Sequence, residues 1–272
     1  MPRLGVLGWP VAHSRSPAMH NAALAALGLE DWRYQLLPVP PERFAGTVRA
    51  LPGAGFVGAN VTIPHKHAAL ECADTASEAA KAIGAANTLS FAPDGAIAAE
   101  NTDAPGFLSA LGVSPQGMSA LVLGAGGSAR AVVWALREAG ASEVSIWNRT
   151  PERARTLAHD LGARAVDAPV PADLLVNCTS VGLEPKAASL KQSASEAQGL
   201  NLPAVTFDQV GNHSYVVDLV YSSTPTPLLI AARSHGVRAV GGLEVLLAQG
   251  ALSFELWTGR PAPLQVMREA LD

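Results

Sequence analysis

Cysteine is scarce in this sequence: its 272 residues include only Cys72 and Cys178. The two lie far apart and without CxxC spacing, so neither a disulfide framework nor a thiolate metal site is expected. The seven histidines show no HExxH or other paired-ligand spacing, and we predict no metal site. This pattern fits a reducing compartment, and we expect a cytoplasmic protein.

Charge is also sparse. Charged residues make up 15% of the chain, the net charge is −4, and no block of Lys and Arg stands out. Because binding to a phosphate backbone needs a basic stripe, a nucleic-acid partner is disfavoured. No stretch approaches the roughly 20 apolar residues that span a bilayer, and the first ten residues lack the apolar run of a signal peptide. We therefore expect no membrane partner.

Apolar residues, at 49%, are plentiful enough for real cores, which excludes a disordered chain. The length suits two domains of about 100–150 residues each. Short apolar runs alternate with Ala- and Leu-rich segments, which predicts an α/β fold with parallel sheets. The expected strands are 3–8, 33–38, 56–61, 87–91, 120–124, 144–148, 174–178, 216–220 and 238–240. The expected helices are 17–27, 42–51, 78–83, 127–139, 153–160, 227–234, 243–257 and 263–271.

One long stretch breaks this alternation. Residues 185–214 are polar, rich in Ser, Gln, Asn and Gly, and contain one short apolar run, Ala204–Phe207. Such a composition is typical of a surface loop or insertion. We expect this segment to belong to neither core.

A glycine-rich turn follows the strand expected at 120–124. The sequence LVLGAGGSARA meets the GxGxxG pattern with Gly124, Gly126 and, in the third place, Ala129. Such glycines permit a tight turn and let the backbone approach a pyrophosphate at a helix N-terminus. A packing turn would have the same glycines, so the next strand decides between the two interpretations. The residues expected to line this cradle are Gly124, Ala125, Gly126, Gly127, Ser128 and Ala129.

The end of the next strand carries Asn148, Arg149 and Thr150, where an NAD-binding fold usually places an acidic residue. A guanidinium and a hydroxyl suit a ribose 2′-phosphate instead, because Arg makes charged, bidentate hydrogen bonds to such oxygens. Arg153 lies one helical turn further on. Thr150 is also expected to cap the helix that Pro151 begins. The sequence therefore favours NADP as the cofactor.

The first hundred residues carry polar groups after successive apolar runs. These are HSRSP with Ser14 and Ser16, the run from Asn60 to Lys66, Asn87 with Thr88, and the run from Asn101 to Asp103. In open α/β sheets, such strand ends form ligand crevices. One Lys, one Asp and several amides and hydroxyls suit a small polyhydroxylated ligand rather than a large apolar one.

These motifs together resemble the shikimate dehydrogenase family over nearly the whole chain. The matching segments are GWPVAHSRSPAMHN (8–21), GANVTIPHK (58–66), GAANTL (84–89), NTDAPGF (101–107), GAGGSARA (124–131), NRT (148–150), NCTSVG (177–182), DLVY (218–221) and GGLEVLLAQGALSFELWTG (241–259). The resemblance implies reversible reduction of 3-dehydroshikimate to shikimate by NADPH, within chorismate and aromatic amino-acid biosynthesis. It also implies an N-terminal α/β substrate domain, a Rossmann-type nucleotide-binding domain and a cleft between them. The expected bounds are 1–103 plus 242–272 for the first domain and 104–241 for the second.

The resemblance also implies roles for single residues. Lys66 and Asp103 would form the catalytic pair. Ser14 and Ser16 would bind the substrate carboxylate with Tyr221 nearby, Thr62, Asn87 and Gln249 would hold the ring, and Gly242 would join the cofactor-binding residues. Lys66 is one of only four lysines, which favours a specific role over a plain surface position. Asp103 could instead cap a helix around Pro105, and we favour catalysis.

The sequence departs from the family pattern in three places. Ser222 and Ser223 follow Tyr221 where an Asn-Pro is common, Glu244 and Val245 stand where a Met is common, and residues 185–214 are longer than usual. Two alternatives stay open: a quinate/shikimate dehydrogenase with broader substrate or NAD use, which has the same motifs, and a non-catalytic nucleotide-binding relative. The oligomeric state is also open, with a homodimer as one option.

Overall fold

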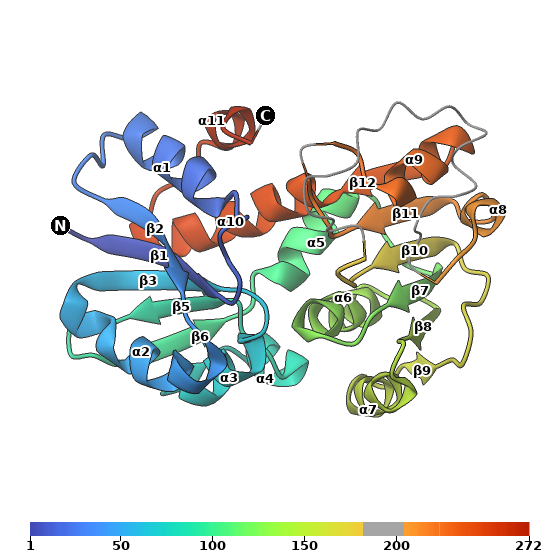
Figure 1. Cartoon of the computed structure of the whole chain (residues 1–272), viewed down its shortest axis with the longest axis horizontal. Coiled ribbons are helices and arrows are strands. Elements are labelled where there is room, and N and C mark those ends of the chain that lie inside the picture. The colour runs from blue at the N-terminus through green and yellow to red at the C-terminus, as the bar shows by residue number, and fades with distance from the viewer. Residues whose placement is uncertain (182–203, 223, 272) are drawn as a thin grey trace. The chain divides into compact units, whose positions relative to one another are not determined.

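A computed structural model describes residues 1–181, 204–222 and 224–271 (Figure 1). The chain forms two compact units. Unit 1 comprises Met1–Gly106 and Leu246–Asp272, and unit 2 comprises Phe107–Val245. The boundaries between the units fall inside two helices, α5 (Asp103–Leu111) and α10 (Gly242–Thr258). The first boundary lies three residues, and the second four residues, after the one expected from the sequence.

Unit 1 is built on a six-stranded mixed sheet in the order β2-β1-β3-β5-β6-β4. The strands are β1 (Arg3–Gly8), β2 (Arg33–Pro38), β3 (Phe56–Val61), β4 (Thr75–Ala76), β5 (Thr88–Phe91) and β6 (Ile97–Glu100). β1 pairs in parallel with β2 and β3, whereas β5 is antiparallel to both β3 and β6. The expectation of purely parallel sheets is therefore wrong for this unit. A short turn joins β5 to β6, and two strands joined by a short turn pair antiparallel.

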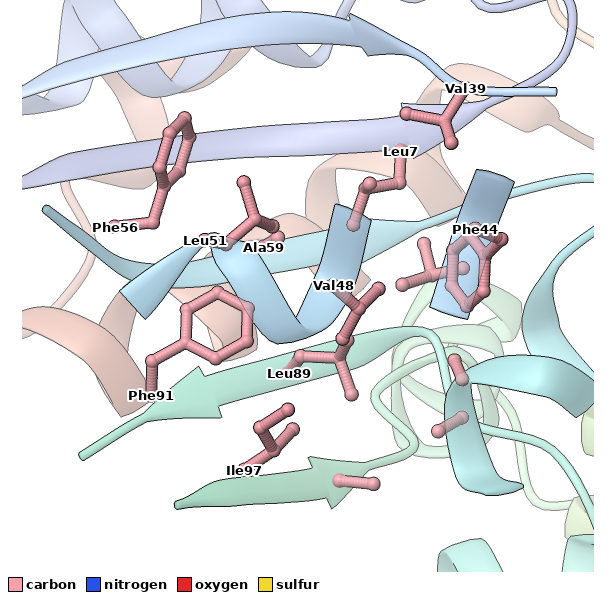
Figure 2. Packing of buried hydrophobic residues seen from close by; sticks show 14 residues of the cluster. Leu7, Val39, Phe44, Val48, Leu51, Phe56, Ala59, Leu89, Phe91 and Ile97 are labelled. Atoms are coloured by element: carbon pink, nitrogen blue, oxygen red, sulfur yellow. The ribbon is translucent and has the colours of Figure 1, made fainter. Parts of the chain in front are cut away.

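One face of this sheet packs on a core of large apolar side chains (Figure 2). Phe44 and Val48 come from α2 (Phe44–Ala50), and they meet Leu7 of β1 and Leu89 of β5. The other helices of the unit are α1 (Ser16–Ala26), α3 (Lys66–Cys72), α4 (Glu78–Ile83), the Leu246–Thr258 part of α10, and α11 (Leu264–Glu269), with short 3-10 turns at Pro41–Arg43 and Pro52–Ala54. α1 packs against α11 and β2.

Unit 2 has a wholly parallel six-stranded sheet in the order β12-β11-β10-β7-β8-β9. The strands are β7 (Ser119–Leu123), β8 (Glu143–Trp147), β9 (Arg164–Ala165), β10 (Leu174–Asn177), β11 (Tyr215–Asp218) and β12 (Arg238–Gly241). Counted from β7, this is the 6-5-4-1-2-3 order of a dinucleotide-binding Rossmann fold. The strand order reverses between β7 and β10, where such folds bind their ligand.

The helices of unit 2 follow its strands. α6 (Gly127–Glu138) packs against β7 and β8, α7 (Pro151–Leu161) packs against β8 and β9, and α9 (Pro227–Ser234) packs against β11 and β12 (Figure 1). Two apolar strands at the centre of the sheet, β7 and β10, are buried throughout except at the start of β7, as expected for strands covered on both faces.

The segment 185–214 is only partly described. Residues 185–203 lie outside the described residues, whereas 204–214 contain a short helix, α8 (Phe207–Val210). Thr206 and Gln209 form a reciprocal capping box on this helix, and Val205 and Val210 are buried in the core of unit 2. The expectation that the whole segment lies outside both cores is therefore wrong for its last part, because the apolar Val205 and Val210 bury themselves against α9 and the sheet.

The structure also contains elements that the sequence pattern did not predict, namely α3, α8, β4, β6 and β9. Each of these is too short to show a clear period of its own. Within the described ranges, no helix combines the length and the apolar character required to cross a membrane.

Candidate active site

Lys66 and Asp103 meet in unit 1. Lys66 is the first residue of α3, which begins shortly after β3, and Asp103 is the first residue of α5, which begins shortly after β6. Lys66 Nζ donates to Asp103 Oδ2 at 2.5 Å, and the two side chains are only 9% and 17% exposed. Such a partly desolvated ion pair is far stronger than a surface pair. It places an ammonium donor and a carboxylate side by side, as acid–base chemistry requires.

Asp103 does not act as the helix cap that the sequence left open. The Ala104 N–H at the start of α5 bonds to Asn101 Oδ1 at 3.2 Å. Both carboxylate oxygens of Asp103 accept from side chains instead, Oδ2 from Lys66 and Oδ1 from Asn87. The carboxylate is therefore directed to the polar cluster at the strand ends.

Two amides complete this cluster. Asn87 Nδ2 lies 2.9 Å from Asp103 Oδ1 and 3.2 Å from Gln249 Oε1. Asn87 is 2% exposed and Gln249 is 8% exposed. Gln249 comes from α10, 162 residues after Asn87 in the chain. The structure thus brings together four residues predicted from separate motifs: Lys66, Asn87, Asp103 and Gln249.

A glycine in α5 permits Gln249 to come this close. A Cβ added at Gly106 would lie 2.7 Å from the backbone nitrogen of Gln249 and 2.8 Å from its Cα. Real Cβ atoms do not approach so closely, so any larger residue would force α5 and α10 apart. Gly106 therefore sets the distance at which Gln249 reaches Asn87.

The serine motif lies at the start of α1. The backbone N–H of Ser16 bonds to Ser14 Oγ at 3.3 Å, and Ser16 is buried whereas Ser14 is half-buried. The guanidinium of Arg15, which lies between them in the sequence, donates a hydrogen bond to the carbonyl of Leu271 at 2.6 Å. Thr62, also half-buried, follows β3, and its N–H bonds to the carbonyl of Leu7 in β1.

The glycine turn of unit 2 joins β7 to α6. Gly124 has a φ of +110°, and a Cβ there would lie 3.0 Å from the carbonyl oxygen of Cys178. Both features require glycine. Gly126 precedes the first helical residue and has nothing within 4 Å of an added Cβ, while Ala129 is fully buried against the sheet. The space beside Gly126, next to the N-terminal N–H groups of α6, is therefore open, which fits a dinucleotide pyrophosphate.

Polar residues follow β8 as the sequence predicted. Asn148 is half-buried, and Arg149, Thr150 and Arg153 are exposed. Within the described ranges, the guanidinium groups of Arg149 and Arg153 make no hydrogen bond or ion pair, unlike that of Arg155, which pairs with Glu152 at 2.7 Å. Thr150 occupies the N-cap position of α7, but its side chain makes no capping bond, so that part of the prediction is wrong.

The remaining predicted residues belong to unit 2. Tyr221 follows β11, and Gly242 begins α10, where an added Cβ would lie 2.5 Å from the carbonyl oxygen of Leu219. Thr88 and Thr102, expected only as polar residues at strand ends and given no role of their own, lie in the cluster around Asn87. Their only signal was their place directly beside Asn87 and Asp103 in the motifs.

Three family models match separate parts of the chain. The family model of the shikimate dehydrogenase substrate binding domain matches residues 6–89, that of shikimate/quinate 5-dehydrogenase matches 110–177, and that of the shikimate 5′-dehydrogenase C-terminal domain matches 242–271.

Individual relatives match nearly the full length of the chain. The shikimate dehydrogenase (NADP(+)) of Thermus thermophilus is 47% identical, with 99% of this chain and 97% of that protein covered. That of Methanopyrus kandleri is 45% identical, with 98% and 94% covered. The crystal structure of shikimate 5-dehydrogenase from Thermus thermophilus in complex with NADP(H) and shikimate has a TM-score of 0.83 at 45% identity, with 99% and 98% covered. The chain belongs to the shikimate dehydrogenase family.

Proposed function

We propose that this protein is an NADP-dependent oxidoreductase that reversibly reduces 3-dehydroshikimate to shikimate, in chorismate and aromatic amino-acid biosynthesis. The observation that carries the proposal is the partly buried Lys66–Asp103 pair, which lies beside Asn87 and Gln249 in a chain that also has a glycine turn at a Rossmann switch point. A non-catalytic relative would have no need of a desolvated ammonium–carboxylate pair, whose formation is costly.

Unit 2 would hold the cofactor. Its residues fit a dinucleotide because the turn from Gly124 to Ala129 leaves backbone N–H groups open, and because Arg149 and Arg153 carry charge that no described side chain neutralises. Asn148, Thr150 and Gly242 would complete the set. When bound, NADPH supplies the hydride and NADP⁺ accepts it. No metal-ligand cluster is found among the described residues.

Unit 1 would hold the substrate. Ser14 and Ser16 offer hydroxyls to the carboxylate, and Thr62, Asn87 and Gln249 offer a hydroxyl and two amides to the ring. Arg15 is engaged by the carbonyl of Leu271, so the serine hydroxyls rather than a guanidinium would recognise the carboxylate. We also assign Tyr221 to the carboxylate.

Lys66 and Asp103 would handle the proton. Reduction of the ketone develops negative charge on the carbonyl oxygen, and the Lys66 ammonium would stabilise that charge and donate a proton to it. Asp103 holds the ammonium in place through its 2.5 Å contact. In the reverse direction, the same pair would accept the proton of the hydroxyl that is oxidised.

A spectrophotometric assay tests the function. Purified protein should reduce NADP⁺ with shikimate, followed by the absorbance of NADPH, and should do so with a far higher kcat/KM than with quinate or with NAD⁺. Equal or better activity with quinate, or with NAD⁺, would favour the quinate/shikimate alternative. No reduction with either substrate and either cofactor would contradict the proposal.

A cytoplasmic location is part of the proposal, supported by the free thiols of Cys72 and Cys178, which suit a reducing compartment. A homodimer is the assembly state to test, by light scattering coupled to size-exclusion chromatography. A monomer mass of 28.0 kDa at micromolar concentration would contradict it.

A further inference from the structure

Two buried threonine hydroxyls lie behind the Lys66–Asp103 pair. Thr88 begins β5 and is fully buried, and Thr102 precedes α5 and is 2% exposed. Their Oγ1 atoms are 3.1 Å apart. Both contact the side chain of Asn87, and neither takes part in the proposed chemistry. We call Asn60, Thr88, Asn87, Thr102 and Asp103 the polar network.

The orientation of the Asn87 amide is fixed from behind. The backbone N–H of Thr102, which can only donate, lies 2.7 Å from Asn87 Oδ1. The Thr88 hydroxyl lies 3.2 Å from the same oxygen, and the Thr102 hydroxyl lies 3.2 Å from it and also accepts from Asn87 Nδ2 at 3.0 Å. One hydroxyl can donate to the other, and whichever of them does so, the second hydroxyl is free to donate to Oδ1. The oxygen Oδ1 therefore faces donors in both arrangements. The amide nitrogen must therefore face the other way.

On that other side lie acceptors. Asn87 Nδ2 lies 2.9 Å from Asp103 Oδ1 and 3.2 Å from Gln249 Oε1. Gln249 is itself held with its oxygen toward Asn87, because its Nε2 donates to the carbonyl of Leu246 at 2.8 Å. The Asn87 amide thus secures one carboxylate oxygen of Asp103 and leaves the other for Lys66. Rotation of this amide by half a turn would set two oxygens against each other and displace Asp103.

The network is anchored further back in the sheet. Tyr34 Oη donates to Asn60 Oδ1 at 2.7 Å, which turns Asn60 Nδ2 toward Thr88 Oγ1 at 3.2 Å and Ser253 Oγ at 3.1 Å. Apart from Asp103, which is half-buried, each member is buried, so these bonds are not weakened by competing water. Strands β3 and β5 and helix α5 contribute members of the polar network, and Tyr34 of β2 and Ser253 of α10 anchor it through Asn60.

We propose that Thr88 and Thr102 are positioning residues for the reaction. Their hydroxyls hold the Asn87 amide in the one orientation that fixes Asp103 against Lys66, although neither hydroxyl touches the reacting atoms. This inference rests on the proposed function. It assigns to Asn87 a second task, the alignment of the acid–base pair, in addition to any contact with the substrate.

The substitution Thr88→Val tests this role. Valine keeps the shape of threonine, and Asn60 Nδ2 retains the Asn87 carbonyl at 3.3 Å and Ser253 Oγ, so the variant should fold. We expect kcat to fall on the order of tenfold, the effect of one buried hydrogen bond that positions an acid–base group. KM for NADP⁺ should stay within about twofold. Thr88→Ser should restore kcat to within about twofold of the parent, and Thr102→Val, which keeps the backbone donor, should lower kcat on the order of three- to tenfold.

A matched control is Thr258→Val. The Thr258 hydroxyl bonds to the Phe254 carbonyl at 2.8 Å in the same unit but outside the polar network, so kcat should not change. A general structural effect would lower the activity of both variants in proportion to their loss of thermal stability.

A double-mutant cycle with Asn87→Ala separates positioning from simple destabilisation. If Thr88 acts through Asn87, Thr88→Val should lower kcat less than about twofold in the Asn87→Ala background. Multiplying effects would overturn the proposal, as would a kcat within about twofold of the parent in both Thr88→Val and Thr102→Val. The parent enzyme is measured first. An inactive parent would contradict the proposed function, whereas an active parent with unaffected threonine variants would contradict only the positioning role.

Discussion

Lys66 is far more buried than Lys81, the other lysine that forms an ion pair in the described part of the chain. Its side chain is 9% exposed and contacts Asp103, whereas Lys81 pairs with Glu78 at the surface, where it is 56% exposed. A surface pair contributes little, but an ammonium held in a desolvated cluster can stabilise charge that develops on a substrate oxygen. The difference between the two lysines offers a direct test.

Lys66→Ala should lower kcat by about 10²–10⁴-fold, the usual size of an acid–base contribution, with a much smaller change in KM for shikimate. Steady-state kinetics in the direction of shikimate oxidation would measure both. Lys81→Ala is the matched control and should leave kcat unchanged. A kcat of Lys66→Ala within about threefold of the parent would exclude Lys66 from the chemistry.

Arg149 should decide the choice of cofactor. Its guanidinium is exposed and has no described partner, so it can bind a ribose 2′-phosphate by charge-assisted hydrogen bonds worth about 1.5–3 kcal/mol each before screening. Arg149→Ala should raise KM for NADP⁺ by about 10- to 100-fold and leave KM for NAD⁺ within about twofold. Added salt should weaken the preference of the parent for NADP⁺.

Arg155→Ala is the control for Arg149, because Arg155 lies six residues further on, in α7, but pairs with Glu152 and Asp167. Its KM values should match those of the parent. An equal loss of NAD⁺ and NADP⁺ affinity in Arg149→Ala would show that Arg149 does not read the 2′-phosphate.

At the scale of whole elements, the approach of α5 to α10 at Gly106 holds the site together. The helices come from distant parts of the chain, and their contact brings Gln249 to Asn87. Gly106→Ala places a methyl group where atoms of Gln249 already lie, so we expect a loss of about 1–3 kcal/mol in the free energy of unfolding. KM for shikimate should rise as well, because Gln249 is displaced. Urea unfolding and steady-state kinetics would measure the two effects.

Gly46→Ala is the counterpart in α2, where an added Cβ has nothing within 4 Å. Glycine inside a helix costs about 0.5–1 kcal/mol relative to alanine, so this variant should be more stable than the parent. If Gly106→Ala were also stabilising, helix propensity rather than the close approach would govern that position.

At the scale of the whole molecule, His20 should couple stability to pH. It is completely buried, stacks on the ring of Tyr34 at 4.2 Å, and neither ring nitrogen has a hydrogen-bond partner among the described residues. Burial lowers the pKa of His20 from 6.5 to about 3. Burial also lowers the pKa of His65 and His213, whereas it raises the pKa of Asp218, which opposes the effect at low pH.

The sign follows from proton binding. Between pH 6.5 and 3 the unfolded chain binds a proton at His20 that the folded chain does not, so stability falls as the pH falls through this window. From about pH 7.5 to about pH 5, His20 alone should cost about 2 kcal/mol. His20→Phe should remove this part of the pH dependence in urea unfolding, whereas His159→Ala, at an exposed position, should not. Parallel pH profiles for His20→Phe and the parent would contradict the assignment.

The sequence by itself determined much of this protein. Gly124, Gly126 and Ala129 are local requirements of one turn, so the nucleotide unit could be predicted from a single motif and the strand that follows it. Long apolar or amphipathic segments such as β1, β3, α6 and α9 were predicted within a residue at each end, because burial of one face dictates their pattern. The resemblance to the shikimate dehydrogenase family also indicated Lys66 and Asp103 as a pair.

Tertiary structure decided what depends on contacts between distant segments. Three such features have no local signal in the sequence. They are the antiparallel pairing of β5 with β3, the burial of Val205 and Val210, and the hydrogen bond from Arg15 to the Leu271 carbonyl. The role of Thr88 is of the same kind. A threonine at the start of a strand looks like any other in sequence, and only the packing of β3, β5 and α5 around it turns its hydroxyl into a support for Asn87 and Asp103. Hydrogen-bond direction depends on which donor meets which acceptor in space, and that is fixed only when the chain has folded.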